Sequence, residues 1–327
     1  MTLSVMTWNV ENLFPRVLGD PQDEIDRYQA KLDLLAGTIS ALNPDVIAFQ
    51  ELGAAALADL QQRLPTFIEA HEGVSDRRGI RVGILSKLTF TAPPADITAF
   101  TGPPPLDSVA GLDDGGQLIH ISALGRGAVR VTVNINGTDI HIVTCHLKSK
   151  LLTFPGGFFS TKDENLRTQV AAAALIRRTA EVAQVRLEVN RLLDEHAADG
   201  VIVLGDFNDG PEAATSQLLL GPPGSVIGSR GFDRPDQGDP ARLFNTAALI
   251  PEDRRYSRIQ QGMKELLDQI YASEELFPRN EDGHRELPAV DSHIDFASQL
   301  PSVSNDPNIR AEEIEPDHAP VTAIFQI

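Results

Sequence analysis

The sequence predicts an α/β fold in which helices cover mixed β-sheets, and two observations lead to this prediction. Short apolar, β-branched segments alternate with longer segments in which apolar residues recur every three or four positions. Two of the short segments are joined by Asn136-Gly137, a pair typical of a tight antiparallel hairpin. Other short segments are separated by helical ones. Sheets built from both kinds of connection contain parallel and antiparallel strands.

Six short segments are predicted to be strands. Each is apolar and is flanked by Gly, Asn, Asp or Pro, as strands usually are. They are Leu3–Thr7, Val46–Phe49, Val82–Ser86, Val129–Ile135, Ile140–Cys145 and Val201–Leu204. The hairpin signal makes the fourth and fifth of them antiparallel neighbours.

Two segments are predicted to be helices. Tyr28–Leu42 has one apolar stripe, formed by Leu32, Leu35, Ile39 and Leu42. A longer helix is expected from about Asp163 to Ala198, with Thr161 and Glu164 spaced as a capping box. Its many Arg and Glu residues indicate an outer helix with one solvated face.

Three stretches rich in Pro, Gly and Asp, at 91–116, 222–241 and 274–310, are predicted to be long surface loops. Candidate functional residues lie on both sides of each stretch, so none of them is expected to link independent domains. We therefore predict a single domain over residues 1–327.

The charge of the chain limits its function without defining it. The chain has 46 acidic and 28 basic residues, and its net charge is −18. This balance argues against tight binding of nucleic acid irrespective of sequence, which depends on Lys and Arg that neutralise phosphates. A nuclease is still possible, because basic groups or a bound metal ion can reverse the potential inside a cleft.

The sequence also gives expectations about location and partners. The first residues contain neither a basic segment nor a long apolar core, so no signal peptide is expected. No apolar run approaches the roughly 18 residues of a membrane-spanning helix. Cys145 is the single cysteine, which rules out an intrachain disulfide. We expect a cytoplasmic protein, and no obligate protein partner is evident.

A polar residue stands at one end of several apolar segments across the whole chain. These residues are Asn9, Glu51, His146, Asp206, Asn208, Asp268, Asp317 and His318. One such residue is usually part of a turn, but the whole set is rich in oxygen donors that suit a hard cation. The sequence has neither a cysteine pair nor a His-x-x-x-His spacing, so Mg²⁺ or Mn²⁺ is favoured over zinc.

Six segments around these residues resemble the motifs of the endonuclease/exonuclease/phosphatase superfamily, which has the deoxyribonuclease I fold. They occur in the order of the family and span nearly the whole chain: Thr7–Leu13, Ile47–Glu51, Thr144–Ser149, Leu204–Asp209, Leu267–Ile270 and Pro316–Val321. The resemblance implies a four-layer α/β sandwich, in which two mixed β-sheets pack face to face with helices on the outside.

The resemblance also implies a role for each residue. Asp206 would hold and deprotonate the attacking water, and Asn208 would fix that water or a phosphate oxygen. Asp268 would orient His318, and His146 would donate a hydrogen bond to the phosphate. Both imidazoles are expected to be cationic, because charged donors bind phosphate more strongly than neutral ones.

The same resemblance assigns the metal ligands. Glu51 would be the principal ligand of Mg²⁺ or Mn²⁺, with Asn9 and Asp317 completing or approaching its shell. The sequence departs from the family at Pro316, where a serine is usual, and at Gln269, where an aromatic residue is usual. Pro316 removes a hydroxyl that could support the site.

Basic residues near these segments are candidates for binding the substrate phosphate: Arg78, Arg81, Lys148, Lys150 and Arg167. We select Lys148, Arg81 and Arg167 and keep exposed surface positions as the alternative. Lys148 is preferred to Lys150 because an extended chain would place it on the same side as His146.

The segment Leu151–Phe159 is apolar and glycine-rich and follows the predicted site directly. Its three phenylalanines either pack beneath a loop, which is the preferred interpretation, or form a lip that stacks on a base or holds an acyl chain.

The sequence therefore predicts a metal-dependent phosphodiester hydrolase that uses an activated water, with a nuclease acting on DNA or RNA as the first candidate. The alternative is a phosphatase or phosphodiesterase acting on a small molecule or a phospholipid. An inactive binding module is disfavoured, because each position of the set holds a suitable residue.

Overall fold

The computed structural model describes residues 1–103, 106–112, 117–195, 199–295, 300–304, 306, 310 and 313–327. Two six-stranded sheets form its centre. In order across the sheet, the first contains β15 (Ala289–Ser292), β17 (Val321–Gln326), β1 (Thr2–Leu13), β2 (Val46–Leu52), β4 (Arg81–Ser86) and β3 (Glu69–Glu72). The second contains β11 (Leu243–Asn245), β14 (Asp268–Ser273), β10 (Gly200–Asp206), β9 (Thr138–His146), β8 (Ala123–Ile135) and β5 (Ala95–Ala99).

Smaller elements surround the two sheets. The helices are α1 (Gln22–Leu42), α2 (Ala56–Arg63), α3 (Glu164–Glu195) and α4 (Ala214–Leu220). The remaining strands are β6 (Val109–Leu112) paired with β7 (Leu118–Ile121), and β12 (Arg258–Gln260) between β13 (Met263–Glu265) and β16 (Ser302–Val303). Short 3₁₀ turns are η1 (Asp239–Ala241), η2 (Thr246–Leu249), η3 (Glu252–Arg254) and η4 (Glu274–Leu276).

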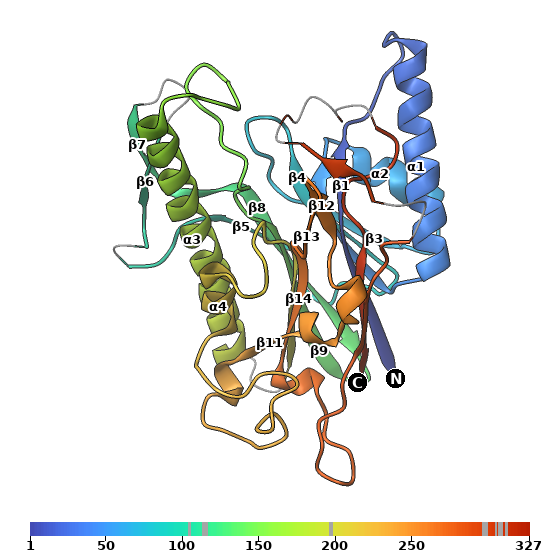
Figure 1. Cartoon of the computed structure of the whole chain (residues 1–327). Coiled ribbons are helices and arrows are strands. Elements are labelled where there is room, and N and C mark those ends of the chain that lie inside the picture. The colour runs from blue at the N-terminus through green and yellow to red at the C-terminus, as the bar shows by residue number, and fades with distance from the viewer. Residues whose placement is uncertain are drawn as a thin grey trace.

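The two sheets pack face to face, and the helices form the outer layers (Figure 1). The alternation of side chains along each strand explains this arrangement. In β1, Leu3 and Val5 belong to the central core, which also contains residues of the second sheet such as Val131. Met6 and Trp8 belong instead to the core beneath α1 and α2. A third core lies between the second sheet and α3 with α4, so the predicted four-layer sandwich is confirmed.

The six predicted strands are present as β1, β2, β4, β8, β9 and β10. The predicted hairpin joins β8 to β9 as antiparallel neighbours, and the φ angles of Asn136 and Gly137 are 55° and 91°. Both are positive, as a type I′ turn requires. Parallel pairs, β1 with β2 and β9 with β10, make both sheets mixed.

The predicted helices are present, with one correction at a helix start. Three residues of the α1 stripe are fully buried, namely Leu32, Leu35 and Ile39. The predicted capping box at α3 is wrong: the backbone N–H groups of Asn165 and Leu166 donate to the carboxylate of Asp163. Thr161 instead accepts from the N–H of Asp163. Residues 196–198, over which we predicted the long helix to continue, lie outside the described residues.

Two of the predicted long loops contain strands. β5 and β6 fall within 91–116, and β15 and β16 fall within 274–310. β5 and β15 each pair with only one strand of a large sheet, at its edge. Edge strands are stabilised by this pairing and need no strong apolar pattern. Residues 104–105, 113–116, 296–299, 305 and 307–309 of these stretches lie outside the described residues.

None of the described helices combines the length and apolar character needed to cross a bilayer.

Gly205 fixes the distance between the two strands that carry His146 and Asp206. It pairs with Cys145 and has a φ of 152°, and a Cβ there would lie 2.0 Å from the Cys145 carbonyl oxygen. We expect Gly205→Ala to reduce the free energy of unfolding by at least about 3 kcal/mol, because backbone must shift to relieve the clash. Gly37→Ala is the control, since no atom lies within 4 Å of a Cβ there. It should stabilise α1 by about 1 kcal/mol. Urea unfolding measures both, and a Gly205→Ala protein as stable as the wild type would contradict this account.

Candidate active site

The predicted site residues gather around one cavity of about 600 Å³. The parallel pairs β1–β2 and β9–β10 have their carboxyl ends at this cavity. Both sheets therefore contribute polar residues from their strand ends to the same site. The predicted residues that line the cavity are Asn9, Glu51, His146, Asp206, Asn208, Asp317, His318 and Arg167. Asp268 has no exposed surface and lies behind His318.

Two of these residues have a left-handed backbone conformation, Glu51 within β2 and Asn208 just after β10. The φ angles of Glu51 and Asn208 are 66° and 53°. Such angles are uncommon for residues with a side chain and are often found at functional sites. Glu51 lies where the register between β1 and β2 shifts, and its Oε2 accepts the N–H of Asn12 at 3.1 Å. The bulge therefore directs the Glu51 carboxylate into the cavity.

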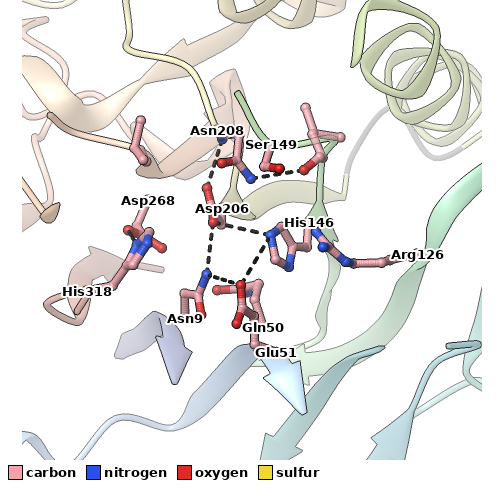
Figure 2. A network of polar contacts seen from close by, with 12 residues as sticks. Asn9, Gln50, Glu51, Arg126, His146, Ser149, Asp206, Asn208, Asp268 and His318 are labelled. Carbon is pink, nitrogen blue, oxygen red and sulfur yellow. Dashed lines mark hydrogen bonds and ion pairs between the residues drawn. The ribbon is translucent and has the colours of Figure 1, made fainter. Parts of the chain in front are cut away.

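Asp206 is the centre of the polar network (Figure 2). Its Oδ2 accepts from Asn9 Nδ2 at 3.0 Å, and its Oδ1 accepts the backbone N–H of Asn208 at 2.8 Å. The Nε2 atom of His146 lies 3.4 Å from the same Oδ2. Burial, together with the nearby charge of Asp268, raises the pKa of Asp206 to about 6. Asp206 is therefore a carboxylate at neutral pH that accepts a proton readily.

Asn9 faces the carboxylates with its amide nitrogen. Its Oδ1 accepts the backbone N–H of Glu11 at 3.0 Å, and this donor fixes which side-chain atom is the oxygen. The Nδ2 atom then donates to Asp206 and, at 3.3 Å, to Glu51 Oε1. The sequence interpretation grouped Asn9 with the metal ligands, and in the structure its amide nitrogen donates to two carboxylates of that site.

His318 and Asp268 form a buried ion pair. His318 Nδ1 donates to Asp268 Oδ2 at 2.6 Å. Burial opposes the charge on the imidazole, but the carboxylates of Asp268 and Asp317 raise the pKa of His318 to about 10. Ser257 Oγ donates to the same Asp268 oxygen at 2.6 Å. A hydroxyl from elsewhere in the chain therefore supports the pair where Pro316 has none.

His146 differs from His318 in its charge. Burial, followed by the positive charges of Arg126 and His318, lowers the pKa of His146 well below its ordinary value. Figure 2 shows Arg126 beside the ring. The expectation of two cationic imidazoles is therefore wrong for His146, which is neutral at physiological pH. A neutral imidazole can still donate one hydrogen bond from Nε2, the atom that faces Asp206.

Asp317 lies at the other side of the cavity between donors. Its backbone N–H donates to Glu11 Oε2 at 2.9 Å, and Arg258 Nε donates to its Oδ2 at 3.1 Å. Although burial acts in the opposite direction, the charges of His318 and Arg258 lower the pKa of Asp317. Asp317 is ionised at neutral pH and belongs to a set of oxygen donors with Glu51 and Asp206. Carboxylate oxygens are the donors that hard divalent cations prefer.

The basic residues selected from the sequence are placed differently from one another. Arg167 lines the cavity and pairs with Glu164. Lys148 and Arg81 are not among the described residues that line it. Lys148 Nζ donates to the carbonyl oxygens of Ser149 and Leu151, both at 3.0 Å. The side-chain alternation used to select Lys148 does not apply, because β9 ends before it.

Five other basic residues line the cavity, namely Arg78, Arg126, Lys150, Arg258 and Arg310. Arg78 lies there in place of Arg81, which pairs with Glu72 at 3.1 Å. Lys150 lies there in place of Lys148. Arg126, at the start of β8, was missed from the sequence because no local pattern distinguishes it. Its Nε lies 3.2 Å from an Asp76 carboxylate oxygen.

The long helix α3 holds the chain that follows His146. Glu181 Oε2 accepts the backbone N–H of Lys148 at 2.6 Å, and its Oε1 accepts that of Gly125 at 3.0 Å. Arg178 Nη1 donates to the Lys148 carbonyl at 2.9 Å. The ends of β8 and β9 are thus joined through one buried carboxylate, next to Arg126 and His146.

One wall of the cavity is apolar and comes from the segment after β9. Leu151, Leu152, Phe154 and Phe159 line it. Phe154 is buried, whereas Phe158 is 67% exposed. The preferred interpretation of three packed phenylalanines therefore holds for Phe154 and is wrong for Phe158.

Comparison with known proteins adds to this geometry. The sequence model described as the Endonuclease/Exonuclease/phosphatase family matches residues 6–302. No curated protein matches the chain in sequence. Among solved structures, a humanized D. rerio TDP2 has a TM-score of 0.56 at 16% identity and covers 100% of this chain and 99% of its own. An endonuclease/exonuclease/phosphatase family protein from Leptotrichia buccalis has a TM-score of 0.54 at 17% identity, with 99% and 100% covered. D. rerio TDP2 complexed with single strand DNA product has a TM-score of 0.54 at 16% identity, with 100% and 99% covered. At these identities, the structural likeness concerns the fold.

Proposed function

The chain belongs to the endonuclease/exonuclease/phosphatase family, and from this premise we propose that it hydrolyses phosphodiester bonds by activating a water molecule, with a divalent cation as cofactor. The observation that carries the proposal is the position of Asp206. This buried carboxylate lies in a cavity between a neutral histidine, His146, and a cationic one, His318, and it is ionised at neutral pH.

Glu51 and Asp317 would hold Mg²⁺ or Mn²⁺, because both are cavity carboxylates whose backbone or side chain is fixed by hydrogen bonds. A bound cation would withdraw charge from a non-bridging phosphate oxygen and so lower the barrier to attack by an anionic nucleophile. A divalent cation would also reduce the repulsion between these carboxylates.

The protein's own residues would move the protons. Asp206 accepts the proton of the attacking water, while Asn9 and the Asn208 backbone hold its two oxygens in place. His318, kept protonated by Asp268, donates to the phosphate as charge accumulates there. His146 donates a hydrogen bond to the phosphate from its neutral imidazole.

A nucleic acid is the first candidate substrate. The basic residues around the cavity are Arg78, Arg126, Lys150, Arg167, Arg258 and Arg310. They give one region of a chain with net charge −18 the cations that contact phosphates. The fold shared with a TDP2 that was crystallised with a single strand DNA product supports the same candidate.

A small or lipid phosphodiester is the second candidate, and the apolar wall favours it. Cavities of about 300–1,000 Å³ suit small ligands, and this one has a volume of about 600 Å³. Leu151, Leu152 and Phe159 could contact an acyl chain or an aromatic group there.

The test is hydrolysis of plasmid DNA, single-stranded DNA, RNA, a choline phospholipid and bis-p-nitrophenyl phosphate, with Mg²⁺, Mn²⁺ or EDTA. We expect cleavage of nucleic acid that EDTA abolishes. Turnover of the lipid or the small diester alone would favour the second candidate. Hydrolysis that persists in EDTA would contradict the metal requirement, and no turnover of any substrate would favour an inactive binding module.

Arg126 and Arg81 are a matched pair for testing substrate binding, since both are arginines paired with a carboxylate but only Arg126 lines the cavity. We expect Arg126→Ala to raise KM for an oligonucleotide by about tenfold or more, because a hydrogen bond to a charged group contributes roughly 1.5–3 kcal/mol. Arg81→Ala should leave KM within about twofold. Equal effects of the two substitutions would show that the cavity does not define the binding site.

A further inference from the structure

Arg258 is a cation placed among the carboxylates of the site. It stands at the start of β12, and its backbone pairs with Glu265 of β13 and, through an isolated bridge, with His318. Its side chain is 24% exposed and lines the cavity. Strand pairing on both sides therefore fixes the backbone of Arg258 beside the cavity.

The charges around Arg258 are those of the proposed metal site. Its Nε lies 3.1 Å from Asp317 Oδ2. Although burial acts in the opposite direction, the carboxylates of Asp317, Asp206 and Glu51 raise its pKa above the ordinary value. Two of these three carboxylates are the ones proposed to hold the divalent cation, so the guanidinium and the metal ion would share a partner.

We propose that Arg258 competes with the divalent cation for Asp317, an inference that rests on the proposed metal-dependent function. Without metal, the guanidinium neutralises the acidic set and holds Asp317 in place. Metal binding takes the Asp317 carboxylate from Arg258, whose N–H groups are then free to donate to a non-bridging oxygen of the substrate phosphate. Metal and phosphate would therefore bind with positive coupling, since the first releases a donor for the second.

Metal affinity is the first measurement, and it needs no substrate. Mn²⁺ binding is followed by calorimetry for the wild type, Arg258→Met and Arg126→Met at one ionic strength. Removing a cation that contacts a ligand should tighten Mn²⁺ binding by about tenfold or more. Arg126→Met is the control for loss of positive charge near the cavity without loss of a contact to Asp317, and it should change the affinity by less than about threefold.

The second measurement follows Arg258 itself in the wild type. The ¹⁵N–¹H signal of its Nε–H group, assigned by its disappearance in Arg258→Lys, should move when Mg²⁺ is added, because the hydrogen bond to Asp317 is lost. This measurement does not depend on whether Arg258→Met folds. A signal that stays in place at saturating Mg²⁺ would overturn the inference.

The outcomes separate the inference from the proposed function. If the wild type binds Mn²⁺ and Arg258→Met binds it no more tightly than Arg126→Met does, the competition is absent while the metal site stands. If the wild type binds neither Mn²⁺ nor Mg²⁺, the metal-dependent function itself is wrong. Tighter binding in Arg258→Met alone, together with the signal shift, supports the competition.

Discussion

Replacing Asp206 with Asn should lower kcat by about 10³-fold or more, in the upper part of the range for loss of a general base. The amide has nearly the same shape as the carboxylate but cannot accept the proton of the attacking water. It also brings an N–H₂ group close to Asn9 Nδ2, which donates to Asp206 at 3.0 Å in the wild type. The measurement is kcat with saturating Mg²⁺ on the best substrate of the hydrolysis panel.

Asp45→Asn is the matched control. Asp45 directly precedes β2 and accepts the backbone N–H of Ser4 at 2.8 Å, at the end of the sheet opposite the cavity. An amide oxygen can accept the same hydrogen bond. The melting temperature should therefore stay close to that of the wild type, and kcat should remain within about twofold. An Asp206→Asn protein that keeps its melting temperature and more than a tenth of the wild-type kcat would exclude Asp206 as the proton acceptor.

The strands and the residues at their ends could be predicted because the information lies close together in the sequence. Short apolar runs define β1 and β10, and a polar residue follows each run. The sheets then bring Asn9 and Asp206 within hydrogen-bond distance, although they are far apart along the chain. Family resemblance supplied the remaining step, which was the pairing of His318 with Asp268.

The other parts of the site depend on contacts that no local pattern encodes. Ser257 reaches Asp268 because the chain returns through β12 beside it, and Arg258 reaches Asp317 for the same reason. Arg126 lies in the cavity because β8 begins next to the end of β9. Lys148 was selected by assuming that β9 continued beyond His146, which is its last residue. Errors of this kind are expected wherever a side chain's direction depends on where an element ends.

Replacing His318 with Ala should lower kcat by about 10²-fold or more, because a charge-assisted donor to the phosphate is lost. In the wild type, kcat/KM should rise with pH through about 6, as Asp206 loses its proton, and fall through about 10, as His318 loses its own. The signs follow from the active form, which needs Asp206 deprotonated and His318 protonated. A pH–rate profile from pH 5 to 10.5 with a non-ionising substrate tests both limbs.

Asp268→Asn tests the charge of His318 while the imidazole itself is kept. Of the groups that raise the pKa of His318, Asp268 acts most strongly, so its neutralisation should lower that pKa and move the alkaline limb to lower pH. The acid limb depends on Asp206 and should move less, and in the same direction, because the Asp268 charge raises the pKa of Asp206 too. A purely structural role for Asp268 would reduce kcat/KM equally at all pH values. An alkaline limb that keeps its position in Asp268→Asn would therefore show that the falling rate above pH 10 does not report the His318 imidazolium.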